Sequence, residues 1–101
     1  MTQVTARREG GDYTLVMEGH ATGAPLVCAG ASSIAASLKN YLKNEKNVLL
    51  HQLVEEAGRF EARFSGQTAA EAAWKMAVMG LLSLQMAAPE AVEVKIFSDR
   101  A

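Results

Sequence analysis

The chain has 101 residues, half of them hydrophobic, and a formal net charge of −1 at pH 7. This size favours one domain, residues 1–101, with enough apolar mass for a modest core. The mixed charges exclude the strong positive field of a nucleic-acid-binding protein. The single cysteine cannot form an internal disulfide, and the first eight residues are too polar for a signal peptide. We therefore expect a cytoplasmic protein that contacts neither nucleic acid nor membrane.

The first half of the chain predicts a hairpin followed by a helix. Residues 2–8 and 13–19 have the composition of strands, and Gly10-Gly11 between them is a turn signal. In residues 27–43 the apolar side chains recur at helical spacing. They are Val27, Ala31, Ile34, Ala35, Leu38, Tyr41 and Leu42.

The second half predicts two strands, a helix and a last strand. Residues 48–56 are rich in strand-forming side chains without clean alternation, and residues 59–64 alternate apolar with charged ones. Thr68 and Glu71 fit a capping box, which predicts a helix over residues 68–87. Residues 91–97 read as the final strand.

The predicted element order is therefore β-β-α-β-β-α-β. Two helices, each with a wide apolar face, pack most simply on one face of a sheet. The sequence predicts an α+β fold in which a mostly antiparallel five-stranded sheet carries both helices on one face.

One short segment holds the residues best suited to chemistry. Cys28 is the chain's only cysteine and lies near the start of the first predicted helix, eight residues after His20. Helix N-terminal amides and the positive end of the helix dipole favour a thiolate, and a nearby imidazolium adds to this. The same amides, near Cys28 and Ala29, are candidates to bind an oxyanion. Ser32 lies one helical turn beyond Cys28, where its hydroxyl can face the sulfur or a substrate.

Structural roles for these residues stay open on spacing alone. A lone cysteine is commonly a small buried hydrophobe, and a histidine after a strand is often an ordinary surface residue. His51 competes as a catalytic base, but its place among leucines within a predicted strand favours a structural role.

Other chemistries find little support. One cysteine and two histidines cannot form an ordinary four-ligand zinc site, and no glycine-rich phosphate-binding motif precedes a helix. We expect neither a metal nor a cofactor. Met76, Met79 and Met86 on the second helix suit a core or a dimer interface.

Four short runs of the chain carry a family resemblance. They are GHA (19–21), VCAGAS (27–32), MGLLSL (79–84) and PEAVEV (89–94). Together with the length and the element order, they resemble the ribosomal-processing cysteine proteases, the Prp family.

The resemblance implies a function and a set of site residues. His20 and Cys28 correspond to the family's catalytic dyad, and Gly19, Ala29 and Ser32 to supporting or substrate-binding positions. Members of the family remove an N-terminal extension from the bacterial ribosomal protein L27, are cytoplasmic and form homodimers. The leading hypothesis is thus a cysteine endopeptidase that acts on the L27 extension.

The loop before Cys28 departs from the family pattern. Relatives usually have a longer, glycine-rich segment there and an aspartate three residues before the cysteine, where this chain has Pro25. A second hypothesis is therefore a non-catalytic, homodimeric peptide-binding or ribosome-associated module with a degenerate active-site loop. A third is a structural homodimer in which Cys28 is simply buried.

Overall fold

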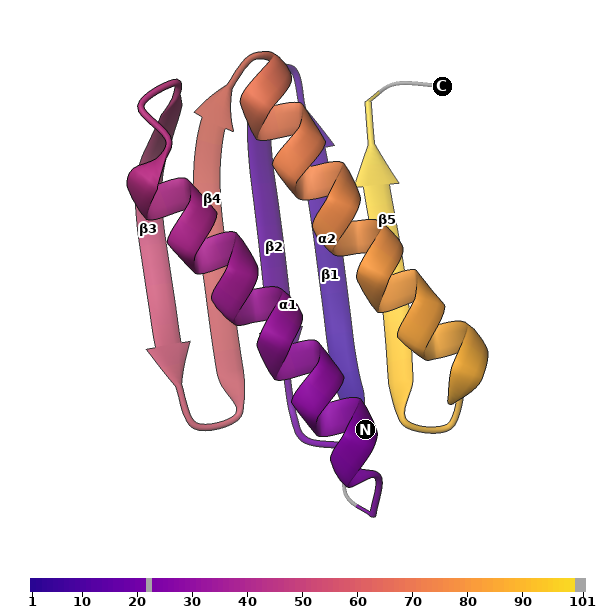
Figure 1. The fold of residues 1–101 in the computed structure, drawn as a ribbon. Helices are drawn as coiled ribbons and strands as arrows, with labels where there is room; N and C mark the ends of the chain where they lie inside the picture. Colours follow the sequence, from indigo (N-terminus) through magenta and orange to yellow (C-terminus); the bar gives the residue numbers. More distant parts are fainter. Residues whose placement is uncertain (22, 100–101) are drawn as a thin grey trace.

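The computed structural model of the protein describes residues 1–21 and 23–99. These residues form the predicted elements in the predicted order (Figure 1). The elements are β1 (Thr2–Glu9), β2 (Asp12–Glu18), α1 (Pro25–Asn44), β3 (Val48–Glu56), β4 (Arg59–Gly66), α2 (Thr68–Ala87) and β5 (Val92–Ser98).

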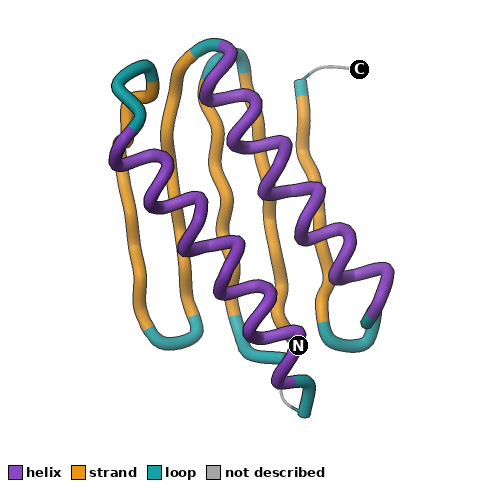
Figure 2. Tube along the Cα trace, in the orientation of Figure 1, coloured by secondary structure: helices purple, strands orange, loops and turns teal. Residues whose placement is uncertain are grey.

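The strands form one five-stranded sheet in the order β3-β4-β2-β1-β5. All neighbouring strands run antiparallel except β1 and β5, which run parallel. Both helices lie across the same face of this sheet, and the other face carries no helix among the described residues (Figures 1 and 2). The predicted α+β architecture is confirmed.

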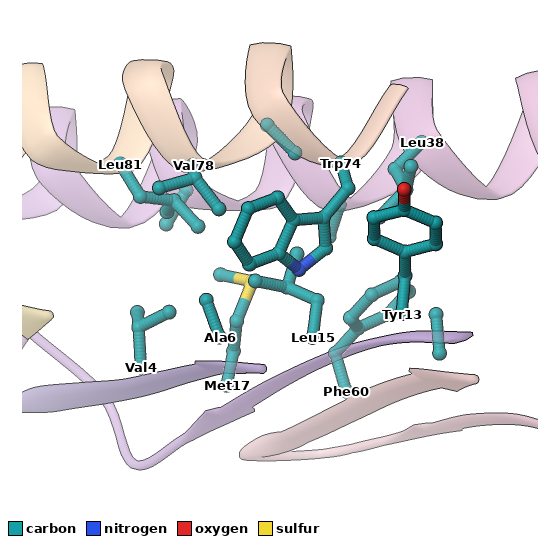
Figure 3. Packing of buried hydrophobic residues seen from close by; sticks show 14 of the residues in the cluster. Val4, Ala6, Tyr13, Leu15, Met17, Leu38, Phe60, Trp74, Val78 and Leu81 are labelled. Atoms are coloured by element: carbon teal, nitrogen blue, oxygen red, sulfur yellow. The ribbon is translucent and has the colours of Figure 1, made fainter. Parts of the chain in front are cut away.

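The core lies between the two helices and the sheet. Side chains alternate along β1, β2 and β4, so every second residue points toward the helices. Leu15 and Phe64 from the sheet and Leu81 from α2 are almost completely buried. Figure 3 shows Trp74 of α2 above Leu15 and Met17, and its ring nitrogen donates a hydrogen bond to the Thr14 carbonyl at 3.1 Å. This bond ties the second helix to the centre of the sheet.

The first helix starts earlier than its apolar pattern predicts. The pattern begins at Val27, whereas α1 begins at Pro25. Proline is well suited to the first turn of a helix, because its φ is already helical and the missing N–H has no partner there. The early start places Cys28 fourth in the helix.

The predicted capping box at the start of α2 is wrong. Gln67 occupies the N-cap position, and no side chain caps the helix. The Glu71 carboxylate instead pairs with the Arg8 guanidinium of β1. Arg8 points toward the helices and is only 7% exposed, so its desolvated charge requires a nearby carboxylate. The hydrogen bond to Glu71 raises the pKa of Arg8, against the opposing effect of burial.

The two helices pack closely against each other at two glycines. A Cβ on Gly30 would lie 3.1 Å from Leu84, and one on Gly80 would lie 2.9 Å from Ile34.

No helix in the described part of the chain is both long and apolar enough to cross a membrane.

Candidate active site

A small cleft brings together the two residues that the sequence suggested for chemistry. His20, Cys28 and Ser32 all line one hollow of about 190 Å³. The hollow lies where β2 ends and α1 begins, beside the turn that joins β3 to β4. Figure 1 shows the start of α1 next to the N-terminal end of β1, at the end of the sheet opposite the β1–β2 hairpin.

The end of β2 holds His20 in place through its backbone. Gly19 has a φ of +86°, and its N–H donates to the Gly58 carbonyl at 2.9 Å. A Cβ on Gly19 would lie 2.4 Å from the Met1 carbonyl oxygen, so only glycine fits there. The amino group of Met1 donates to the His20 carbonyl at 2.8 Å. Gly19 thus contributes to this arrangement through its backbone.

Cys28 completes the first turn of α1, where the sequence placed it. Its thiol donates a hydrogen bond to the Ala21 carbonyl at 3.6 Å. No hydrogen bond joins its sulfur to the His20 ring among the described residues. A carbonyl oxygen only accepts, so the bond to Ala21 exists only while the thiol keeps its proton.

The backbone amide of Cys28, one of the expected oxyanion donors, is engaged within the helix in this structure. The N–H groups of Val27 and Cys28 both donate to the Ala24 carbonyl, each at 3.1 Å. Pro25 has no N–H to offer. The early helix start is the physical reason, because it turns the Cys28 amide into an ordinary helical donor. Ala29 follows within the helix and is exposed, and Ser32 is exposed at the cleft.

Charged residues from β3 and β4 form the other wall of the cleft. Glu55, Glu56 and Arg59 all line it. The Lys39 amino group contacts both oxygens of Glu55 at 3.1 Å. Arg59 pairs with Glu61 at 2.5 Å and with Glu18 at 2.8 Å.

The paired carboxylates act on the charge state of Arg59. The hydrogen bond to Glu61 is the main cause that raises the pKa of this guanidinium above its ordinary value. Burial opposes the shift, and Glu18 adds to it. Arg59 therefore remains a fixed cation between two carboxylates rather than a proton donor.

His51 lies away from this cleft. Its Nε2 atom is 2.7 Å from the Ser65 hydroxyl, and it borders a separate hollow with Arg7 and Arg63. It therefore does not share a cleft with Cys28. No group of three or more His, Cys, Asp or Glu side chains in the described ranges could hold a metal ion.

Sequence reasoning missed the wall of the cleft that comes from the β3–β4 turn. Gly58 and its neighbours are about thirty residues from Cys28, and no spacing rule connects them. The pairing of β2 with β4 brings them to His20, since Glu18 lies opposite Arg59.

Comparison with known proteins identifies the family. The model of the cysteine protease Prp family matches residues 1–93. The chain belongs to the cysteine protease Prp family. As a member of this family, it is a cysteine protease. None of the curated protein sequences compared with the chain matches it.

Solved structures of similar proteins share the fold. The essential ribosomal processing protease Prp from S. aureus, in complex with a covalently linked product peptide, has a TM-score of 0.80 and 20% identity, over 95% of this chain and 99% of that one. The same protease with a substrate peptide has a TM-score of 0.77 and 21% identity, over 95% and 99% of the two chains. SMU.848 from Streptococcus mutans has a TM-score of 0.78 and 23% identity, over 98% and 96%.

Proposed function

We propose that this protein is a cysteine endopeptidase that removes the N-terminal extension of ribosomal protein L27, with Cys28 as nucleophile and His20 as base. The observation that carries the proposal is the shared cleft: the chain's one thiol and an exposed imidazole line the same hollow, which is open to solvent. The ribosomal substrate is supported by the S. aureus relative, which is named a ribosomal processing protease. L27 itself follows from the motif resemblance.

The chemistry needs a proton acceptor and a route for the leaving group. His20 takes the thiol proton as the Cys28 sulfur forms a bond to the scissile carbonyl carbon. When the C–N bond breaks, the protonated imidazole returns that proton to the departing amine. Water then attacks the thioester carbon while His20 accepts a proton from it. The C–S bond breaks, the acid product leaves, and His20 returns the proton to the Cys28 sulfur.

The resting cleft must rearrange before this reaction starts. The thiol has to leave the Ala21 carbonyl and meet the imidazole. Catalytic hydrogen bonds often form only when substrate is bound. An oxyanion requires donors other than the amides of Val27 and Cys28, which Ala24 already occupies.

We place the protein in the cytoplasm, where thiols stay reduced and ribosomal proteins are made. We also propose a homodimer, formed through the groove between α1 and α2. Ile34 and Leu38 lie in this hollow of about 600 Å³, together with Met76, which is 79% exposed. A second copy of the chain would cover this apolar surface.

A cleavage assay on the host's own L27 terminus tests the proposal. Cys28→Ala should abolish cleavage, because the described cleft offers no comparable nucleophile. His20→Ala should lower the rate roughly 10²- to 10⁴-fold, and Ser32→Ala should do less because it only orients or solvates. Cleavage by Cys28→Ala at the parent's rate would end the proposal that Cys28 is the nucleophile.

One observation favours the binding module as a second candidate. The Cys28 thiol and amide both donate hydrogen bonds to backbone carbonyls, as expected for a cysteine without a catalytic role. Alkylation by iodoacetamide at pH 6.5 separates the two. An activated thiol reacts faster than free cysteine, whereas an idle one reacts no faster. A thiol that reacts only after unfolding would indicate a purely structural cysteine.

A further inference from the structure

The His20 ring rests on a glycine of the β3–β4 turn. Gly58 has a φ of +76°, and a Cβ built on it would lie 2.9 Å from His20 Nε2. The Cδ2 and Cε1 atoms of the ring would lie 3.5 and 3.6 Å from that Cβ. The imidazole therefore occupies the space that a side chain at position 58 would need.

The glycine is held firmly relative to the strand that carries His20. The Gly58 carbonyl accepts a hydrogen bond from the Gly19 N–H at 2.9 Å. Next to this bond, Glu18 lies opposite Arg59 in the antiparallel pairing, and their side chains form an ion pair of 2.8 Å. These contacts fix the position of Gly58 relative to the backbone of His20.

The ring has little else to orient it. No hydrogen bond to either ring nitrogen of His20 joins it to the other described residues. A base that no polar partner orients depends on packing to restrict its rotamers, and loss of orientation by about 1 Å can cost a factor of about 10² in rate.

We infer that Gly58 is a positioning residue, whose missing side chain lets the imidazole of His20 lie in the cleft beside Cys28. The inference rests on the proposed roles of His20 and Cys28. A side chain at position 58 would displace the end of the imidazole, which is free to swing into solvent because His20 is exposed. The fold would survive this change, and the base would be lost from its place.

Gly58→Ala tests the inference, with Gly10→Ala as its matched control. Both glycines have positive φ, at +76° and +60°, so alanine strains the backbone at both. A Cβ on Gly10 meets nothing within 4 Å, whereas one on Gly58 meets the ring. Thermal melting should therefore show similar losses for the two variants. We expect kcat/KM of Gly58→Ala to fall about 10- to 100-fold through kcat, and that of Gly10→Ala to stay within about twofold of the parent.

A double-mutant cycle on thiol reactivity shows whether the effect passes through His20. The rate of Cys28 alkylation at pH 6.5 is measured for Gly58→Ala in the parent and in the His20→Ala background. The inference is supported if Gly58→Ala lowers the alkylation rate in the parent but not in the His20→Ala background. An equal loss in both backgrounds, or a Gly58→Ala variant that matches Gly10→Ala in both assays, overturns it.

The cycle also separates this inference from the proposed function. If His20→Ala leaves alkylation and cleavage unchanged, the dyad itself is wrong, whatever Gly58 does. If His20→Ala lowers the rates of alkylation and cleavage and Gly58→Ala lowers neither rate, the dyad stands and the positioning role of Gly58 is wrong. The ring resonances of His20 in NMR spectra provide a readout without catalysis, since they should shift in Gly58→Ala and not in Gly10→Ala.

Discussion

Glu56 stands at the cleft without a charge partner. Among the residues that the structure describes, it has neither an ion pair nor a side-chain hydrogen bond, whereas Glu55 is paired with Lys39. Around this wall the carboxylates are Glu18, Glu55, Glu56 and Glu61, and the cations are Lys39 and Arg59. The wall is therefore net acidic, which favours peptides with basic residues next to the cleaved bond.

Peptide pairs that differ by one charge check this preference. A peptide with lysine near the scissile bond should be cleaved about two- to fivefold more efficiently than its glutamate counterpart, as expected for a solvent-exposed charge contact. Glu56→Gln should narrow the difference, and so should added salt, which screens exposed charges. Equal kcat/KM for both peptides at low salt would show that the acidic wall does not contact the substrate.

The individual site residues were predictable to different degrees. The residue motifs identified His20 and Cys28, and the structure places both in one cleft. The hydrogen bond from the Cys28 amide to the Ala24 carbonyl was not predictable, because the apolar pattern starts at Val27 and gives no sign of the helical turn that Pro25 begins. A glycine at position 58 is consistent with a turn, but its contact with His20 depends on the register of β2 against β4.

At the scale of one element, α2 is held at its start by a tertiary ion pair rather than by a local cap. Thr68→Ala should change the free energy of unfolding by less than about 0.5 kcal/mol, because its hydroxyl caps nothing. Glu71→Ala should destabilise the protein clearly more, since it leaves the charge of Arg8 buried and unpaired. Urea denaturation of the two variants gives the comparison. A larger effect from Thr68→Ala would restore the capping box.

The helix α2 carries both fully buried and highly exposed apolar side chains. Leu81 is completely buried, whereas Met86 is 85% exposed. Leu81→Ala should cost about 2–5 kcal/mol of unfolding free energy, and Met86→Ala should stay within about 0.5 kcal/mol. The same denaturation experiment measures both. Similar losses would mean that Met86 is covered in solution.

The strand β3 shows why the direction in which side chains point is harder to predict from sequence than the bounds of an element. Its residues do not alternate cleanly because the pairing with β4 shifts between Leu50 and Gln52, where His51 is the extra residue. Such a bulge changes which face each later side chain points to. Strand propensity predicted the bounds of β3 correctly, but the bulge arises from pairing with a distant strand.

For the whole molecule, the groove between the helices carries the dimer proposal. Met76→Lys would bring a charge into the apolar surface around Tyr41, so it should convert a dimer into a monomer. Met86→Lys is the control, because Met86 is similarly exposed but does not line this groove. Sedimentation velocity at micromolar concentration gives the masses. A parent chain of about 10.8 kDa in that experiment would rule out the dimer.

The parallel pairing of β1 with β5 joins the first strand to the last. During synthesis β1 leaves the ribosome early, yet one of its edges stays open until β5 has been made. Every residue of the cleft has been made by position 60, long before the sheet beneath it can close. Such long-range closure is slow, and an open strand edge is prone to pair with other chains. A nascent chain stalled before residue 92 should therefore carry all the cleft residues and still have no peptidase activity.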